Sequence, residues 1–366
     1  MALSIGIVGL PNVGKSALFN ALTRAQNGPS SNYLFSTTKP SMATTPVPDS
    51  RIDTLSALVK PRKTTRATVD FIDIAGLVRG SSKGEGLGNQ FLGTIRECAA
   101  ILQVVRCFDD ANIIHIAGSV DPLRDIETVE TEFILADIQS VERRLERLQR
   151  QAKGDKEAFA AAESMAALLQ HLDSGQAASV FTAQGNEMFQ TAWNELGLLS
   201  AKTVIYCANV DEDHLAKDNE HVQALRAFAA GRNAGVVTIC ARLEEELHGL
   251  PEAEQADMFA AYGIAESGLA QIIRAGYHSL GLISYFTAGE KEVRAWTIRR
   301  GWKAAQAAGV IHTDFERGFI RVEIIAYEDY VRLGSEAACR AAGLLRVEGR
   351  DYVMRDGDVA HFLFNV

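Results

Sequence analysis

The sequence predicts an α/β protein whose main domain is a doubly wound, mostly parallel sheet with helices on both faces. Short apolar segments alternate with helical stretches over most of the chain, which is typical of a parallel sheet. A long stretch of helical periodicity interrupts the alternation between about residues 127 and 195. Short strands separated by turn signals fill the chain from residue 282 onward, which indicates a separate β-rich domain.

Five apolar segments are the strands expected for the parallel sheet. The first, Leu3–Gly9, is followed by a glycine loop and by a helix over Lys15–Arg24, an order typical of the start of an α/β layer. The other four segments are Thr68–Ile74, Ala100–Cys107, Thr203–Ala208 and Val236–Ala241.

The interrupting stretch predicts an antiparallel helical hairpin. Its first half has a heptad pattern and its second half has another apolar stripe, with Lys153-Gly154-Asp155 between them as a turn. Two ordinary packed helices are the alternative interpretation. The heptad positions are Ile134, Ile138, Val141, Leu145, Leu148 and Ala152, and the second stripe is Phe159, Ala162, Ala166, Leu169 and Leu172.

The C-terminal strands set the last predicted boundary. They are expected at Val293–Ile298, Phe319–Ile325, Leu344–Val347, Tyr352–Met354 and Val359–Phe364. The predicted domains are therefore residues 1–281, interrupted by a helical insert at 127–195, and residues 282–366.

Composition narrows the class of protein. The 366 residues are 47% hydrophobic and 23% charged, with a formal net charge of −9, which excludes a disordered or fibrous chain and argues against an overall basic nucleic-acid coat. The five cysteines are scattered without CxxC spacing, so reduced thiols are expected. No stretch approaches the roughly 18 apolar residues of a membrane span, so we expect a cytoplasmic protein with neither membrane nor DNA as a partner.

The strongest motif is a phosphate-binding loop, Gly9 to Ser16, which matches GxxxxGK[ST] between a strand and a helix. Its backbone amides and the following helix N-terminus would hold a phosphate chain. Lys15 would contact the β- and γ-phosphates and stabilise transferred charge, while the Ser16 hydroxyl would bind Mg²⁺. The expected nucleotide contacts in this region are Pro11, Asn12, Val13, Gly14, Lys15, Ser16 and Ala17.

A second motif, Asp73-Ile74-Ala75-Gly76, has the DxxG form at the end of a predicted strand. Asp73 would act on Mg²⁺ through water, and the Gly76 amide would reach the γ-phosphate. Leu77 follows where a Ras-like protein has the glutamine that orients water, so hydrolysis must be very slow or use another polar group. The intervening loop needs a threonine for the metal, and spacing leaves Thr37, Thr38, Thr44 and Thr45 open.

The base site departs from the guanine motif NKxD. The strand Thr203–Ala208 is followed by Asn209-Val210-Asp211-Glu212, so the second position lacks lysine and the fourth is glutamate. Without the aspartate that accepts guanine's paired donors, the preference for guanine should change. Asn209, Val210 and Glu212 are candidate base-side residues, and Cys240-Ala241 is expected at the same end after the next strand.

Together these segments resemble the YchF family, an Obg-related group of ribosome-associated ATPases in the TRAFAC class. The resemblance covers essentially the whole chain and rests on residues 6–23, 70–92, 104–118, 208–213 and the C-terminal strands. It implies a P-loop G domain of Obg type over residues 1–281, a coiled-coil hairpin insert, and a ubiquitin-like β-grasp (TGS) domain over residues 282–366.

The resemblance also implies roles for particular residues. Asn209 and Glu212 match the NxxE pattern of members that prefer ATP to GTP, and Leu77 matches the hydrophobic replacement of the catalytic glutamine. His115, in the NIIH segment, matches a histidine thought to supply the missing catalytic function. Alignment selects Thr37 as the Mg²⁺ threonine, although Leu34 and Lys39 depart from the family pattern around it.

Further partners follow from the same resemblance. Asn12 matches an asparagine that binds a monovalent cation in some related GTPases, which makes K⁺ a candidate cofactor beside Mg²⁺. The implied partners are ATP and the ribosome, chiefly its large subunit, with RNA contact through the hairpin and the TGS domain. The hairpin's basic residues are Arg143, Arg144, Arg147, Arg150 and Lys153, for which a solvated face is the alternative.

The predicted function is Mg²⁺-dependent hydrolysis of ATP to ADP and phosphate, with GTP as a weaker substrate, by a nucleotide-gated regulator of translation or of a stress response. Two other hypotheses are retained. The chain could be a nucleotide-gated ribosome- or RNA-binding module in which hydrolysis is incidental, or an Obg-type GTPase. A small-molecule kinase is disfavoured because the switch and base motifs occupy the positions where a lid and acceptor pocket would be needed.

Overall fold

The computed structural model describes residues 4–27, 41–74, 87–182, 185–232, 234–247 and 250–365. The chain forms two compact units. Unit 1 comprises Met1–Ala43 and Asp70–Ile272, and unit 2 comprises Thr44–Val69 and Ile273–Val366. This division differs from the predicted boundary at residue 282, because an internal segment of the chain folds with the C-terminal residues. The assignment of the C-terminal domain as TGS stays a prediction.

The sheet of unit 1 has the strand order β2-β4-β1-β5-β6-β7. β1 is parallel to β4 and β5, and β5, β6 and β7 continue the parallel arrangement. The predicted α/β class with a mostly parallel sheet is therefore confirmed. The strands are β1 (Ser4–Val8), β2 (Ser41–Pro46), β4 (Thr68–Asp73), β5 (Ala100–Arg106), β6 (Thr203–Asn209) and β7 (Gly235–Ile239).

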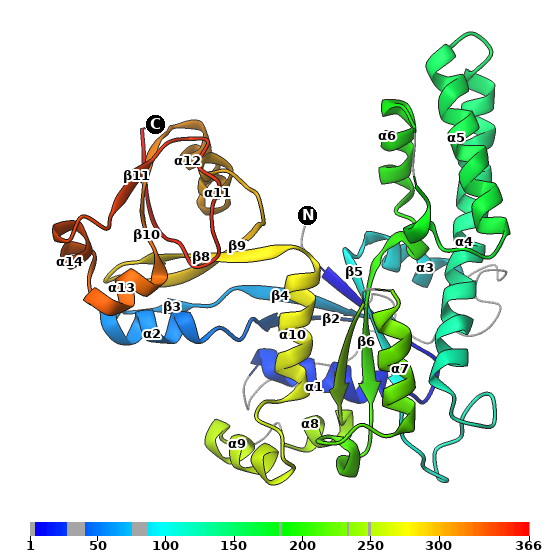
Figure 1. Ribbon diagram of the computed structural model, residues 1–366, viewed down its shortest axis with the longest axis horizontal. Helices are drawn as coiled ribbons and strands as arrows, with labels where there is room; N and C mark the ends of the chain where they lie inside the picture. The colour runs from blue at the N-terminus through cyan, green and yellow to red at the C-terminus, as the bar shows by residue number, and fades with distance from the viewer. Residues whose placement is uncertain are drawn as a thin grey trace. The chain divides into compact units, whose positions relative to one another are not determined.

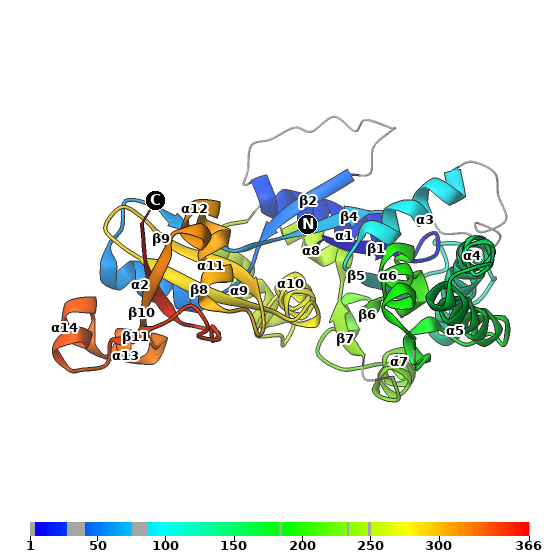
Figure 2. The same ribbon diagram turned by 90° about the horizontal axis from the view of Figure 1, so that it is seen from above.

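Helices cover both faces of this sheet (Figures 1 and 2). One face packs against α4 (Pro122–Gln151) and α7 through an apolar cluster that includes Val105, Tyr206 and Leu225. On the other face, α1 packs beside α8. The helices of this region are α1 (Lys15–Asn27), α3 (Leu87–Glu97), α7 (Glu220–Ala230), α8 (Ala241–Leu247), α9 (Glu252–Ala261) and α10 (Gly268–Ser279), the last of which continues into unit 2.

The insert contains two long helices and a shorter third one. α4 (Pro122–Gln151) and α5 (Lys156–Asp173) pack along each other and project from the sheet of unit 1 in Figure 1. The side chain of Asp155 accepts hydrogen bonds from two backbone amides at the start of α5, which fixes the turn between them. α6 (Glu187–Leu196) adds Phe189 to the same core, so the insert is a three-helix cluster.

The predicted second stripe is confirmed at Ala162, Leu169 and Leu172, which belong to or pack against the core of the insert, and was wrong at two positions. Phe159 is 56% exposed and Ala166 is exposed, whereas the buried face of α5 carries Ala158, Met165 and Leu168. Alanines lie on every face of this helix, so hydropathy alone does not identify the side that packs. Short 3₁₀ turns at Ala178–Val180 and Leu199–Ala201 complete the insert.

Unit 2 contains a mixed sheet in the order β11-β10-β12-β8-β9-β3. β8 and β9 form an antiparallel hairpin, β12 lies parallel to β8, and β10 is antiparallel to both β12 and β11. The predicted strand at Tyr352–Met354 was wrong, since Val353 forms only an isolated bridge to Lys303. The strands are β3 (Thr64–Thr65), β8 (Leu282–Ala288), β9 (Val293–Arg299), β10 (Phe319–Ile325), β11 (Arg346–Glu348) and β12 (Val359–Phe364).

One face of this sheet packs against alanines of α11 around Tyr285 and Phe362. The internal segment contributes α2 (Ser50–Val59), whose Arg51 bonds to both Asp49 and Asp356 and lies 5.2 Å from the ring centre of Phe286. The remaining helices are α11 (Ala304–Ile311), α12 (Thr313–Arg317), α13 (Tyr327–Leu333) and α14 (Glu336–Ala341). Among the residues described, no helix has the length and apolar character needed to cross a bilayer.

Candidate nucleotide-binding site

The predicted phosphate loop joins β1 to α1 and has the backbone that its sequence requires. Gly14 has a φ of +99°, and a Cβ there would lie 2.1 Å from the side-chain nitrogen of Asn209, so no larger residue fits. Asn12 also lies in the left-handed region, with a φ of +62°. Since α1 begins at Lys15, its positive N-terminus faces this loop.

Lys15 is buried, and its Nζ donates a hydrogen bond of 2.6 Å to the carbonyl of Leu10. Burial lowers the pKa of Lys15 to about 8, and the nearby carboxylate of Asp73 counteracts this effect. Burial raises the pKa of Asp73, which Lys15 opposes in turn. The structure therefore brings the lysine of the first motif and the aspartate of the second close enough to interact.

Asn209 joins the phosphate loop to the base side of the site. Its amide nitrogen donates to the carbonyl of Val13 at 2.9 Å, and its amide oxygen accepts from the backbone N–H of Ala241 at 3.0 Å. The side chain is buried, so these bonds hold the loop against the end of β6 and the start of α8. Asn209 thereby shapes the site through backbone groups, as expected for a clamp between three segments.

Asp211 lines the cavity, but its carboxylate already has a neighbouring partner. Its carboxylate accepts from the backbone N–H of His214 and lies beside the ring of the same residue, so it caps the short 3₁₀ turn Glu212–His214. Cys240 is buried, and burial raises the pKa of its thiol to about 11. Glu212, the residue after Asp211, lines the same cavity.

A cavity of about 490 Å³ lies over these segments. That volume is within the range of sites for small molecules. The predicted residues that line it are Asn12, Gly14, Lys15, Ser16, Ala17, Asn209, Val210, Glu212, Cys240 and Ala241. Pro11 and Val13 do not line it. Val13 is instead buried beneath the loop.

Several lining residues were missed from the sequence, namely Phe108, Asp109, Asp110, Ile113, Asp211 and Arg242. They follow β5 or β6 or lie just after β7, at the carboxyl ends of parallel strands, where ligands of open α/β sheets bind. That position in the predicted sheet is the signal that could have found them. Arg106, at the end of β5, organises this loop by donating to the carbonyls of Phe108, Asp110 and Ile113.

The metal site is described only in part. Ser16 offers a hydroxyl and Asp73 a carboxylate, and such oxygen ligands suit Mg²⁺, so the residues present fit this ion. Thr45 is 1% exposed within β2, which argues against it as a metal ligand. Thr37, Thr38, Gly76 and Leu77, whose roles were predicted above, lie outside the described residues. The K⁺ site at Asn12 stays a prediction.

His115 does not line the cavity. Its Nδ1 accepts a hydrogen bond from the backbone N–H of Ala117 at 3.1 Å, so the ring proton is on Nε2. Nε2 donates to Asp125 at 2.8 Å, and both side chains are about 95% buried. In this arrangement both ring nitrogens have protein partners, and the predicted catalytic role of His115 would need the ring to move.

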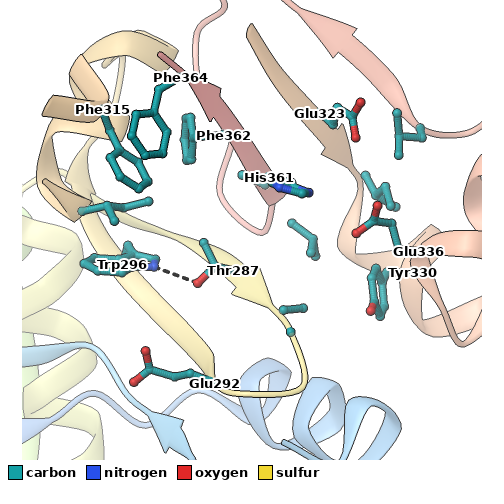
Figure 3. A pocket seen from close by; sticks show the side chains of 17 residues that line it. Thr287, Glu292, Trp296, Phe315, Glu323, Tyr330, Glu336, His361, Phe362 and Phe364 are labelled. Atoms are coloured by element: carbon teal, nitrogen blue, oxygen red, sulfur yellow. Dashed lines mark hydrogen bonds between the residues drawn. The ribbon is translucent and has the colours of Figure 1, made fainter. Parts of the chain in front are cut away.

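A second hollow, of about 490 Å³, lies within unit 2 (Figure 3). Glu323, Glu336 and His361 face it with ligand atoms within 4.8 Å of one another, a spacing that could hold a metal ion. However, the guanidinium of Arg340 bonds to both carboxylates, at 2.8 and 3.0 Å. A metal ion would have to displace this guanidinium from both acids, and we infer no metal site there.

Two family models match separate parts of the chain. Residues 4–130 match a family model described as a 50S ribosome-binding GTPase, and residues 282–365 match one named YchF-GTPase_C and described as a protein of unknown function. The chain is 50% identical over its full length to the "Ribosome-binding ATPase YchF" of Bacillus subtilis, and 50% identical to that of Haemophilus influenzae. This chain belongs to the YchF family.

The solved structure of the Schizosaccharomyces pombe YchF GTPase extends the match to three dimensions. It has a TM-score of 0.85 and 40% identity, and the match covers 99% of this chain and 97% of that one. The predicted resemblance to YchF is thus confirmed. Membership in this family of P-loop GTPases and ATPases implies a nucleotide hydrolase, which the phosphate loop around Lys15 suits.

Proposed function

We propose that this chain is a Mg²⁺-dependent ATPase that hydrolyses ATP to ADP and phosphate, with GTP as a weaker substrate. The observation that carries the proposal is the base end of the cavity. Asn209 is committed to backbone groups, Asp211 caps a neighbouring turn, and Glu212 stands where a guanine-binding motif has aspartate. A site without that aspartate lacks the acceptor for guanine's paired hydrogen-bond donors, so it should no longer favour guanine.

Each part of the site has a separate role in the proposed hydrolysis. The loop amides and the N-terminus of α1 hold the phosphate chain, and Lys15 stabilises the charge that develops on the transferred phosphoryl group. Bound Mg²⁺, held by Ser16, by Thr37 and by Asp73 through water, would neutralise charge on the β- and γ-phosphates. The Gly76 amide would contact the γ-phosphate. Once its ring has moved from its present position, His115 orients or deprotonates the attacking water.

The first test is an equilibrium titration of the full chain with fluorescent ATP and GTP analogues in the presence of Mg²⁺. Tighter binding of the ATP analogue is expected. The double variant Val210→Lys/Glu212→Asp, which restores the NKxD pattern, should shift the preference toward GTP, while Glu254→Asp on exposed α9 should not. Tighter GTP binding by the unaltered chain would replace this proposal with an Obg-type GTPase.

The ribosome is the proposed partner, because the relatives are named ribosome-binding ATPases and one matching family model is described as 50S-binding. We place the contact chiefly on the large subunit and the site of action in the cytoplasm, with a nucleotide-gated role in translation or in a stress response. Ribosome cosedimentation with ATP, ADP and no nucleotide tests the gating.

RNA contact is proposed through the insert and the predicted TGS domain. A hollow of about 370 Å³ between α4 and α6 is lined by Arg96, Arg143, Arg144 and Arg147 and contains one acid, Glu195. Phosphate groups suit such a surface. Arg143→Glu/Arg147→Glu should weaken cosedimentation, whereas Lys217→Glu, an exposed charge reversal outside the insert, should not. Equal effects of the two changes would argue against the contact.

A second candidate is a nucleotide-gated binding module in which hydrolysis is incidental. The burial of His115 against Asp125 favours it, because that ring is not poised for catalysis as placed. His115→Ala decides between the two. Loss of turnover with ATP affinity retained supports the enzyme, whereas unchanged turnover, together with nucleotide-dependent ribosome binding, supports the module.

A further inference from the structure

The segment that joins β5 to α4 connects three parts of unit 1. Asp110 and Ile113 line the nucleotide cavity, and the carbonyl of Ile114 accepts a hydrogen bond of 3.1 Å from the side chain of Asn12 in the phosphate loop. The next residue, His115, bonds to Asp125 in the first turn of α4. One short segment thus touches the cavity, the phosphate loop and the base of the insert.

In this segment the polar residue is buried and its apolar neighbours are exposed, which is the opposite of the usual pattern. His115 is buried, while its neighbours Ile114 and Ile116 are 79% and 56% exposed and Ile113 is 36% exposed. Exposing isoleucines while burying an imidazole is unfavourable unless other bonds hold the arrangement. The bonds from His115 to Asp125 and Ala117 do so, which points to a second arrangement that becomes accessible once they break.

Asp125 belongs to a long, well-anchored helix. Asp121 caps α4 by accepting from the backbone N–H of Arg124, and α4 then runs through 30 residues to pack along α5 in the insert (Figure 1). Arg124 also lies 3.4 Å from the Asp125 carboxylate. A displacement of the insert along or about α4 therefore moves Asp125, whereas His115 is held separately by the loop contacts of Asn12 and Arg106.

We propose that Asp125 is a positioning residue that holds His115 in a resting place away from the nucleotide, and that a movement of α4 separates the pair and frees the imidazole for the attacking water. This inference rests on the proposed catalytic role of His115. On this proposal the insert transmits movement through α4. A partner bound to α4 and α5 would change the turnover number without contacting the nucleotide.

The test compares steady-state ATP turnover of the full chain and of Asp125→Ala, with and without ribosomes. Losing one charge-assisted hydrogen bond shifts a two-state equilibrium by about ten- to hundredfold. Basal kcat should rise by up to about that factor with the KM for ATP unchanged, and stimulation by ribosomes should fall correspondingly. Asp125→Asn keeps an acceptor oxygen without the charge and should fall between, which also covers the case that the alanine variant does not fold.

Asp121→Ala is the matched control, because it weakens the start of the same helix by removing its cap and leaves the His115 partner in place. It should not raise kcat. An NMR spectrum of the imidazole N–H protons supplies a second readout. The slowly exchanging Nε2 proton of His115 should be lost in Asp125→Ala and kept in Asp121→Ala.

Three results would overturn the proposal. Turnover of Asp125→Ala that falls to the level of His115→Ala would make Asp125 a helper of catalysis. Unchanged turnover despite loss of the protected proton would mean that the pair does not limit hydrolysis. An equal rise in Asp121→Ala would indicate general loosening of α4. Separately, wild-type turnover in His115→Ala would remove the proposed catalytic role itself, and the double variant His115→Ala/Asp125→Ala should match His115→Ala if that role holds.

Discussion

Glu244, in α8, should make the stability of the protein depend on pH near neutrality. The residue is 8% exposed, and its carboxylate accepts a hydrogen bond of 3.2 Å from the backbone N–H of Leu269 at the start of α10. Burial raises the pKa of Glu244 from 4.5 to about 7, and bonds from the backbone of Leu269 and Gly268 oppose the rise. The folded chain thus holds a proton on this group that the unfolded chain releases.

Proton linkage gives the direction and the size of the pH effect on the free energy of unfolding. Between pH 4.5 and 7 the folded state binds one more proton at Glu244 than the unfolded state, so the free energy of unfolding falls as pH rises. The contribution is fully present below pH 4.5 and is lost through pH 7. One pKa unit corresponds to about 1.4 kcal/mol, so the loss at this residue is at most roughly 3 kcal/mol.

Glu244→Gln removes the titratable carboxyl group but keeps an oxygen that can accept a hydrogen bond from the backbone N–H of Leu269. The variant should gain stability relative to the original chain as pH rises from 5 to 8, by an amount of order 2–3 kcal/mol. Equilibrium urea unfolding at several pH values measures it, with Glu254→Gln on exposed α9 as the control. Parallel pH profiles for Glu244→Gln and the original chain would refute the reasoning.

Three further changes test the site and its support. Gly14→Ala should abolish binding of a fluorescent nucleotide, because the new Cβ would meet the side chain of Asn209; titration checks this, and retained affinity would contradict the tight approach. Asn209→Ala leaves a buried carbonyl and a buried N–H without their partner, each worth about 1–3 kcal/mol, so a lower unfolding midpoint and weaker nucleotide binding are expected together. Asp137→Ala should cost about 3–5 kcal/mol in urea unfolding, because the fully buried carboxylate pairs with Arg96 and accepts from the backbone of Leu199 and Ser200; a cost below about 1 kcal/mol would mean that these bonds are dispensable.

The features that could be predicted from the sequence are those that depend on neighbours along the chain. The loop from Gly9 to Ser16 specifies its own turn and the helix after it, and the apolar runs around β5 and β6 are long enough to identify buried strands. The clamp formed by Asn209 was not foreseen in its details, although its place at the end of a parallel strand put it near the phosphate loop.

Features set by distant partners were not predicted. Whether His115 is free or bound depends on Asp125, ten positions later, and on a turn at Ala117 that no sequence rule specified. The two residues of β3 join the C-terminal sheet by pairing with β9, more than two hundred positions away. No local pattern in residues 44–69 indicates such a partner, so the predicted boundary left them in the first domain.

The course of those residues limits how this protein can be divided or recombined. Unit 2 is assembled from two separate stretches, and α2 buries Ile52 and Leu55 within it. A chain cut after residue 281 would lose most of this unit and leave α2 with its apolar face uncovered. The C-terminal stretch fused to another protein would therefore lack the part of unit 2 that the internal segment supplies. The internal segment and the C-terminal strands must both be present for unit 2 to form.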